Sequence, residues 1–312
     1  MDETQAYLAH EFLDDYRAER MDRRSMLRRI TLLLGGAVTA SAWLQMQGVS
    51  VSVAEAAESY NYRIPPVPPT VATIDENDPS IATAGAVQFS ARDGATLFGY
   101  VAKPAGLSPV PAIIIIHDNR GLSDHQRDVA RRFAKQGFIA LAIDLVSREG
   151  GSGSMPDGAA VSAALSRAGT ARHVGDLTAA IDYLISQPDV VNTGSGVIGY
   201  CFGGSLTWRM AVGDERVAAA VPYYGSAPPL ENVPAMRAAT FGVYASDDDR
   251  VNQSSVPLEE ALRVNGKTYA MKRYPGTRHG FFNDTGSVYE PEAASDAWSD
   301  TVAWFRQYLP TA

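Results

Sequence analysis

Gly199-Tyr200-Cys201-Phe202-Gly203-Gly204 decides the fold of this 312-residue chain, because it places the only cysteine between a strand and a helix. The preceding Gly196–Ile198 predicts a short buried strand, and residues 205–211 predict a helix. A sharp turn of small residues between the two projects the middle side chain from the carboxyl end of the strand, and the glycines relieve the crowding. The stretch therefore predicts a nucleophile elbow that carries a thiol, although a lone cysteine is usually a small buried hydrophobe.

A base and an acid for this thiol follow it along the chain. His279 is the only histidine after Cys201, and nearby glycines on both sides place it on an exposed loop. The strand-like run Thr240–Tyr244 ends in three successive carboxylates, Asp247, Asp248 and Asp249. An imidazole with a pKa near ~6.5 can take the thiol proton, and a carboxylate can hold the imidazole in the correct tautomer. The order thiol, carboxylate, histidine predicts a Cys-Asp-His triad, with the three carboxylates not yet distinguished.

Four segments together resemble the dienelactone hydrolase family, a branch of the α/β-hydrolases: residues 116–122, 199–204, 244–252 and 274–282. The resemblance extends from about residue 86 to residue 309. It implies an α/β-hydrolase fold, with a mostly parallel doubly wound sheet and helices on both faces. It also implies hydrolysis of small esters or lactones through a thioester on Cys201, without a cofactor. Matching the acid loop selects Asp248 as the triad acid, with Asp247 and Asp249 left open to a one-residue slip.

The same resemblance implies further residues around the nucleophile. The backbone N–H groups of Phe202 and Asn119 are expected to form the oxyanion hole, and two such donors stabilise the charge of a tetrahedral intermediate. Tyr200, next to the nucleophile, is expected to line the site. Asp118 stands where the family usually has a Glu that contacts the resting thiol, so how this thiol is held is open.

Asn283 is a second departure from the family pattern. The dienelactone enzymes carry an Arg there that holds the substrate carboxylate, and an amide cannot supply that bidentate charged grip. The substitution favours neutral esters or lactones as substrates. Another arginine, such as Arg120 or Arg148 on neighbouring loops, could instead fill the role.

The amino terminus, residues 1–57, has the pattern of a signal peptide. A basic stretch, Asp22–Arg29, precedes an apolar run, Ile30–Leu44, and Ala54-Glu55-Ala56 resembles a cleavage site. The paired arginines predict export by the twin-arginine machinery, to the periplasm or another site outside the cytoplasm. The alternatives are a buried or interfacial helix, with the protein cytoplasmic or anchored in a membrane. Residues 58–80 predict a Pro-rich linker or strap, and residues 81–312 the hydrolase domain.

Composition narrows the function further. A net charge of −8 without a basic patch argues against a nucleic-acid role, and one cysteine excludes an intrachain disulfide. No group of residues has the spacing of metal ligands, and the oligomeric state is left open. His117 is expected to be structural, whereas His125 and His173 are expected on exposed helix faces. Besides an esterase, the motifs admit a thioesterase or acyltransferase, or a hydrolase-like shell that only binds.

Alternation of strand and helix patterns from residue 81 onward supports the doubly wound sheet. The expected strands cover residues 86–90, 96–103, 112–116, 138–143, 196–198, 217–222, 240–244 and 269–274. The expected helices cover residues 123–136, 157–167, 173–186, 205–211 and 293–308.

Overall fold

The computed structural model describes residues 1–60, 62, 73–106 and 109–311. Within them, eight strands form one sheet in the order β1-β2-β4-β3-β5-β6-β7-β8, and only β2 runs antiparallel to its neighbours. The strands are β1 (Ile81–Ser90), β2 (Thr96–Pro104), β3 (Ala112–Ile116), β4 (Ile139–Asp144), β5 (Ser195–Tyr200), β6 (Val217–Tyr223), β7 (Ala239–Asp247) and β8 (Tyr269–Arg278). The expected α/β-hydrolase fold with a mostly parallel sheet is confirmed.

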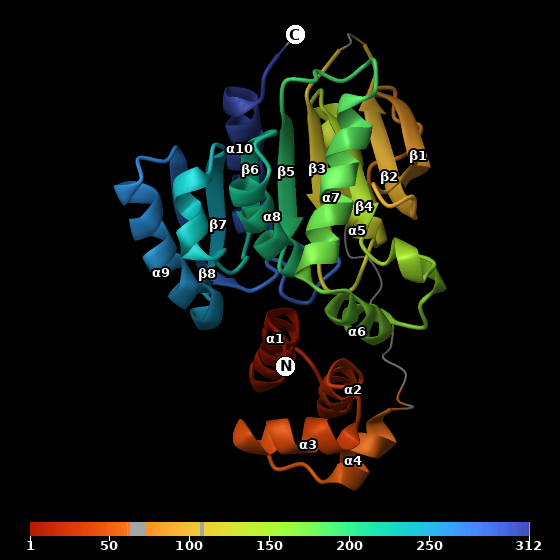
Figure 1. Cartoon of the computed structure of the whole chain (residues 1–312), viewed down its shortest axis with the longest axis vertical. Helices are drawn as coiled ribbons and strands as arrows, with labels where there is room; N and C mark the ends of the chain where they lie inside the picture. Colours follow the sequence, from red (N-terminus) through yellow and green to blue (C-terminus); the bar gives the residue numbers. More distant parts are fainter. Residues whose placement is uncertain (61, 63–72, 107–108, 312) are drawn as a thin grey trace.

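Helices cover both faces of this sheet (Figure 1). On one face, Phe133 of α5 (Asp124–Lys135) packs against Trp298 and Phe305 of α10 (Pro291–Tyr308). On the other lie α7 (Thr170–Ile185), α8 (Phe202–Gly213) and α9 (Asp249–Val264). The central strand β3 is a run of alanine and isoleucine buried along its whole length, as a strand covered on both faces requires. This rigid sheet fixes the loops that follow the carboxyl ends of β3, β5, β7 and β8.

The first sixty residues form four helices, α1 (Glu3–Arg17), α2 (Arg23–Leu33), α3 (Ala37–Met46) and α4 (Val53–Ser59). We call these helices the N-terminal cap. The cap lies below the carboxyl ends of the central strands, next to α6 (Gly158–Ala168) (Figure 1). The apolar run from Ile30 to Leu44, expected as one signal segment, is broken at Gly35 and Gly36, whose φ angles are +76° and +156°. No helix of the described residues is long and apolar enough to cross a membrane.

Ion pairs and apolar contacts join the cap to the hydrolase domain. Arg28 of α2 binds Asp157, the residue that caps α6, at 2.8 Å with both side chains largely buried. Arg250 at the start of α9 binds Asp14 of α1 at 3.1 Å, and Arg209 of α8 binds Glu3. The inward faces of α1 and α2 bury apolar side chains, among them Leu8, Phe12, Leu13, Met26 and Ile30. The cap is therefore packed against the domain as part of one fold.

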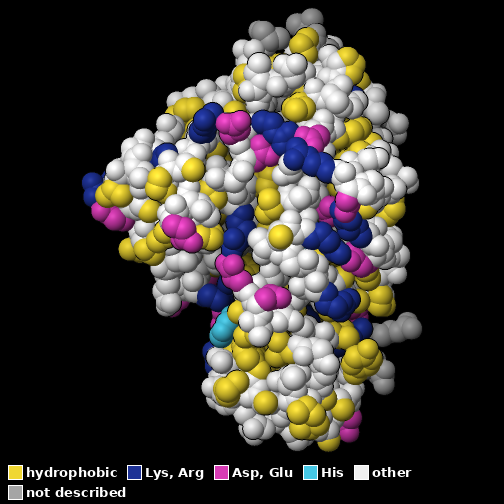
Figure 2. Space-filling model, in the orientation of Figure 1, with side chains coloured by type: hydrophobic (Ala, Val, Ile, Leu, Met, Phe, Trp, Pro, Cys, Tyr) yellow, Lys and Arg dark blue, Asp and Glu magenta, His cyan; other side chains and the backbone are white. Residues whose placement is uncertain are grey.

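The outer side of the cap is more apolar than the rest of the visible surface (Figure 2). Val38, Met46 and Val53 are among the most exposed large hydrophobic side chains of the described residues, and all three belong to α3 or α4. Part of the expected Pro-rich strap, residues 63–72, lies outside the described residues. Two of its described residues contact α5, since the Ile74 N–H donates to Asp128 and Asp78 binds Lys135.

Candidate active site

Cys201 occupies a strained turn between β5 and α8. Its φ and ψ are +59° and −116°, which a residue with a side chain adopts only when the surrounding structure enforces them. The neighbouring glycines are required by close backbone contacts. A side-chain carbon at Gly199 would collide with the Gly203 carbonyl, and one at Gly203 would collide with the Ile116 carbonyl of β3. The strand–turn–helix therefore has the geometry of a nucleophile elbow, and Cys201 is 5% exposed.

His279 and Asp248 form a hydrogen-bonded pair beside this thiol. His279 Nδ1 lies 2.6 Å from Asp248 Oδ2, which leaves Nε2 buried and without a partner among the described residues. The pKa of His279 is raised, because the Asp248 carboxylate outweighs the opposing effect of burial. The pKa of Asp248 is lowered, because the His279 charge and hydrogen bond outweigh burial. The imidazole is therefore oriented by Asp248 with Nε2 free for chemistry.

The structure distinguishes the three successive carboxylates. Asp248 lies at the junction of β7 and α9 and is the one that reaches His279. Asp247 is exposed, and its carboxylate accepts a hydrogen bond from the Ser246 hydroxyl. Asp249 is exposed in the first turn of α9, where an acidic side chain favours the helix dipole.

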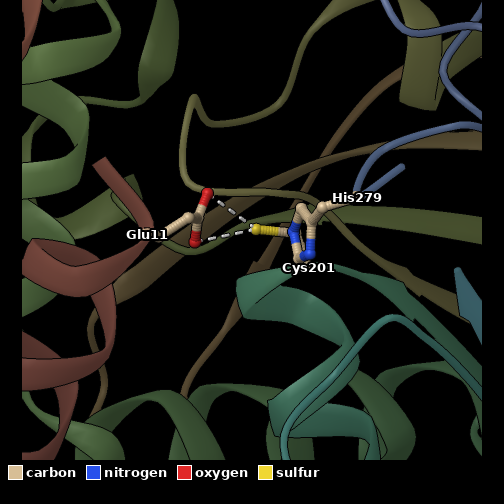
Figure 3. A group of neighbouring side chains, drawn as sticks. All are labelled: Glu11, Cys201 and His279. Atoms are coloured by element: carbon tan, nitrogen blue, oxygen red, sulfur yellow. Dashed lines mark hydrogen bonds between the residues drawn. The ribbon is translucent and has the colours of Figure 1, made fainter. Parts of the chain in front are cut away.

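A carboxylate from the N-terminal cap also reaches the nucleophile (Figure 3). The Cys201 thiol donates to Glu11 of α1, with Sγ 3.1 Å from both carboxylate oxygens. Asn119 Nδ2 donates to the same carboxylate, and the Tyr7 hydroxyl lies 3.8 Å from Sγ. Burial, followed by the charge of Glu11, raises the pKa of the Cys201 thiol well above its ordinary value. Burial also raises the pKa of Glu11 itself.

Asp118 does not take the place of the family Glu at the thiol. Its carboxylate accepts from the backbone N–H and from Nη2 of Arg120, both at 2.8 Å. The contact that the family makes from the residue after His117 is made here by Glu11, 190 positions before the nucleophile. No motif marks Glu11 in the sequence. Residues 1–19, which precede the basic stretch, are acidic, and this is unusual for a signal peptide. They are the one feature of the sequence that indicates a different role for this segment.

The remaining residues expected at the site lie beside the thiol or line the cavity around it. The Phe202 backbone N–H interacts with the thiol and favours its ionised form, and its role as an oxyanion donor stays a prediction. Asn119 and Tyr200 line the cavity beside it, with Tyr200 stacked on Phe282 at 5.3 Å. Asn283 also lines the cavity, but its amide oxygen accepts from Thr285 within its own turn.

The other histidines and Arg148 serve the fold. His117 is structural as predicted, since its ring contacts the Asp118 carbonyl and accepts from the Leu145 N–H. The expected exposure of His125 and His173 is wrong, because both are buried, against Asp284 and the Leu165 carbonyl respectively. Arg148 is paired with Asp93 and Asp176, away from the residues that line the cavity.

A cavity of about 380 Å³ lies between the cap and the hydrolase domain and opens onto Cys201 and His279. Glu11, Arg20 and Arg29 line it from the cap side, and Cys201 and His279 from the domain side. This volume is at the small end of ligand pockets, which suits a small substrate. Glu11, Cys201 and His279 also place one potential metal-ligand atom each within 4.8 Å of one another. Sequence spacing could not indicate that group, because Glu11 joins it only through the fold.

The buried thiol on a strained elbow, the aspartate–histidine pair and the sheet order define an α/β-hydrolase with a cysteine at the nucleophile position. Comparisons with known proteins identify the branch. The family model for the dienelactone hydrolase family matches residues 97–309, so the chain belongs to that family and is a hydrolase acting on ester or lactone bonds.

Individual relatives agree with this assignment. A protein of Methylorubrum extorquens, described as a candidate carboxymethylenebutenolidase, is 31% identical over 237 residues, covering 72% of this chain and 81% of the relative. A relative in Escherichia coli with the same description is 27% identical, over 78% of this chain and 94% of its own. The crystal structure of a candidate dienelactone hydrolase from Klebsiella pneumoniae superimposes with a TM-score of 0.65 at 26% identity, over 72% of this chain and 100% of that one.

Proposed function

We propose that this protein hydrolyses small esters or lactones by covalent catalysis, with Cys201 as nucleophile, His279 as general base and acid, and Asp248 as the residue that orients His279. The observation that supports it most directly is the arrangement of the site. Asp248 holds His279 Nδ1 at 2.6 Å and leaves Nε2 without a partner among the described residues. A ring nitrogen of His279 lies within 4.8 Å of the Cys201 sulfur. This is the set of relations that activates a nucleophile.

The steps balance without a cofactor. His279 Nε2 takes the thiol proton as Sγ attacks the carbonyl carbon, and the carbonyl oxygen becomes an oxyanion facing the N–H groups of Phe202 and Asn119. Collapse forms the thioester and expels the alkoxide, which receives the proton from His279. Water then attacks the thioester, giving one proton to His279, and the thiolate leaves and recovers it. The carboxylic acid product is released and the resting thiol is restored.

The resting thiol donates to Glu11, so this hydrogen bond must break before His279 can accept the proton. The raised pKa of His279 means that the neutral, proton-accepting imidazole forms only above its ordinary pKa of about 6.5. We therefore expect kcat/KM to rise with pH through a midpoint above that value.

Trapping the acyl-enzyme tests the proposal. Wild-type protein mixed with an excess of a p-nitrophenyl ester and quenched in acid should gain the mass of one acyl group on the peptide that contains Cys201. Cys201→Ala should show neither this mass nor turnover, with an unchanged circular dichroism spectrum. Turnover that survives in Cys201→Ala would contradict the mechanism. Adding an acceptor alcohol separates the acyltransferase alternative, because a transferase would form a new ester faster than free acid.

Retention of the cap follows from the same site. Cleavage after residue 56 would remove Glu11, so an exported enzyme that works with the site described here keeps its amino-terminal residues. Export by the twin-arginine route stays a prediction, tested by fractionating the native cells. The mass of the protein recovered from each fraction would show whether residues 1–56 are present.

A further inference from the structure

Arg29 of α2 is a buried guanidinium without an anionic partner. Its side chain makes no hydrogen bond or ion pair with any described residue, and Nε is fully buried without a partner. The residue is 9% exposed, and it lines the cavity that contains Cys201 and His279. Because an Arg side chain cannot lose its proton, it carries a full charge in this position.

The other charged groups of the cavity are already engaged. Arg20 binds Asp15 at 2.8 Å, and Arg120 binds Asp118 at 2.8 Å. Asp22 caps α2 by accepting from the Ser25 N–H and hydroxyl. Glu11 accepts from the thiol and from Asn119. Arg29 is therefore the cation in this cavity that still lacks a counterion among the described residues.

The contacts that Arg29 does make do not offset its burial. Its guanidinium carbon lies 5.2 Å from the centre of the Phe12 ring, which is a weak cation–π contact. Removing an unpaired ion from water costs more free energy than such a contact returns, even after the protein relaxes. Burial and the neighbouring positive charge of Arg120 lower the pKa of Arg29, and they outweigh the opposing charges of Asp15, Glu11 and Asp118, none of which forms an ion pair with it. An anion entering the cavity would relieve both effects.

We infer that Arg29 is an anion-binding residue of the active-site cavity and that it holds a carboxylate carried by the substrate. This inference rests on the proposed function and adds to it a specificity-determining residue, Arg29, which lies in the N-terminal cap and outside the family's motifs. Asn283 has no charge with which to hold the carboxylate, and by itself it favours neutral substrates. Arg29 supplies the guanidinium from the cap, so the inference reverses the neutral preference expected from Asn283. A planar carboxylate matches the two-pronged donor of Arg. A dianion such as phosphate fits less well, because the cavity also holds Glu11, Asp15 and Asp118.

A pair of matched substrates tests the inference. The p-nitrophenyl esters of succinate and butyrate have acyl groups of similar size, and only succinate ends in a carboxylate. We expect the wild type to have the higher kcat/KM for the succinate ester. Arg29→Gln should reduce the ratio of the two kcat/KM values by at least about tenfold, as the loss of a charge-assisted hydrogen bond predicts. Arg29→Lys, which keeps the charge but loses the two-pronged geometry, should give an intermediate ratio.

Arg24→Gln is the matched control, because Arg24 is an exposed arginine of the same helix with no described partner. It removes the same charge and should leave the ratio unchanged. A wild-type preference for the butyrate ester, or an equal change in kcat/KM for both esters in Arg29→Gln, would overturn the inference. If Arg29→Gln unfolds, as judged by its melting temperature, the Arg29→Lys ratio decides.

A binding measurement separates failure of this inference from failure of the proposed function. Succinate itself is not hydrolysed, so calorimetric titration of full-length wild type with succinate reports the anion site alone. We expect saturable binding that Arg29→Gln weakens and Arg24→Gln does not. Binding without ester hydrolysis would leave the anion site standing and refute the esterase. Hydrolysis that depends on Cys201, without succinate binding or an Arg29-dependent ratio, would support the esterase and refute the anion site.

Discussion

Replacing Glu11 by Gln should make the Cys201 thiol more acidic. The carboxylate oxygens lie 3.1 Å from Sγ, and a thiolate formed there would face their negative charge. At an effective dielectric constant of ~20, two unit charges at this distance repel by about 5 kcal/mol. His279 and Arg250 offset part of this repulsion. If about a quarter remains, roughly 1.4 kcal/mol, the thiolate fraction at fixed pH should rise about tenfold in Glu11→Gln.

Alkylation by iodoacetamide measures this change, because the thiolate is the reactive form and the chain has one cysteine. A more acidic thiol is also a weaker nucleophile, so a tenfold gain in thiolate should give only about a threefold gain in rate at fixed pH. The pH midpoint of the rate should move lower. Glu3→Gln, on the same helix but with an exposed carboxylate, is the control. Slower alkylation of Glu11→Gln would refute the reasoning and indicate that Glu11 takes the thiol proton.

Three other predictions concern the same site. Asp248→Asn should lower kcat by about 10⁴-fold, because the amide favours the wrong imidazole tautomer, whereas Asp247→Asn and Asp249→Asn should stay near wild type; equal losses in steady-state kinetics would contradict the assignment. Since burial raises the pKa of Glu11 in the folded state, the unfolded state loses this proton first, and stability falls as pH rises through the two pKa values. Glu11→Gln should therefore raise the melting temperature relative to wild type at pH 7 but not near pH 4, and a gain of equal size at both would argue against an ionised Glu11. Zn²⁺ should inhibit and a chelator should restore activity, because Cys201 and its neighbours present three ligand-type atoms; inhibition that persists in the Glu11→Gln variant at equal potency would exclude the carboxylate as a ligand.

The sheet could be predicted from the sequence because its strands have local signals. The isoleucine run of β3 and the glycine-flanked cysteine after β5 each determine a strand and its end without reference to the rest of the chain. The helix α9 was not predicted, although it starts directly at the acid loop. Its apolar positions are few, and Pro257 within it is a residue that usually interrupts helices. Its packing against β7 outweighs that local preference.

The three residues of the proposed triad could be located for a similar reason. In this fold the nucleophile, acid and base each follow a strand, so chain order alone locates them. Glu11 and Arg29 have no such relation to a strand. They reach the cavity because α1 and α2 pack across the carboxyl end of the sheet, and the pattern of that segment is equally that of a signal peptide. Hydrophobic periodicity cannot distinguish a leader from a helix packed on its own domain.

The cap links the two departures from the family pattern that the sequence shows. Asp118, one methylene shorter than the family Glu, pairs with Arg120, and Glu11 contacts the thiol. Asn283 lacks a charge, and Arg29 brings one into the same cavity. Both replacements come from the N-terminal cap. Two ion pairs hold the cap in place: Arg28 of the cap binds Asp157 of the hydrolase domain, and Arg250 of the domain binds Asp14 of the cap. Losing the cap should therefore impair control of the thiol and selection of the substrate together. Arg28→Met, which weakens only the docking of the cap, should impair both in proportion.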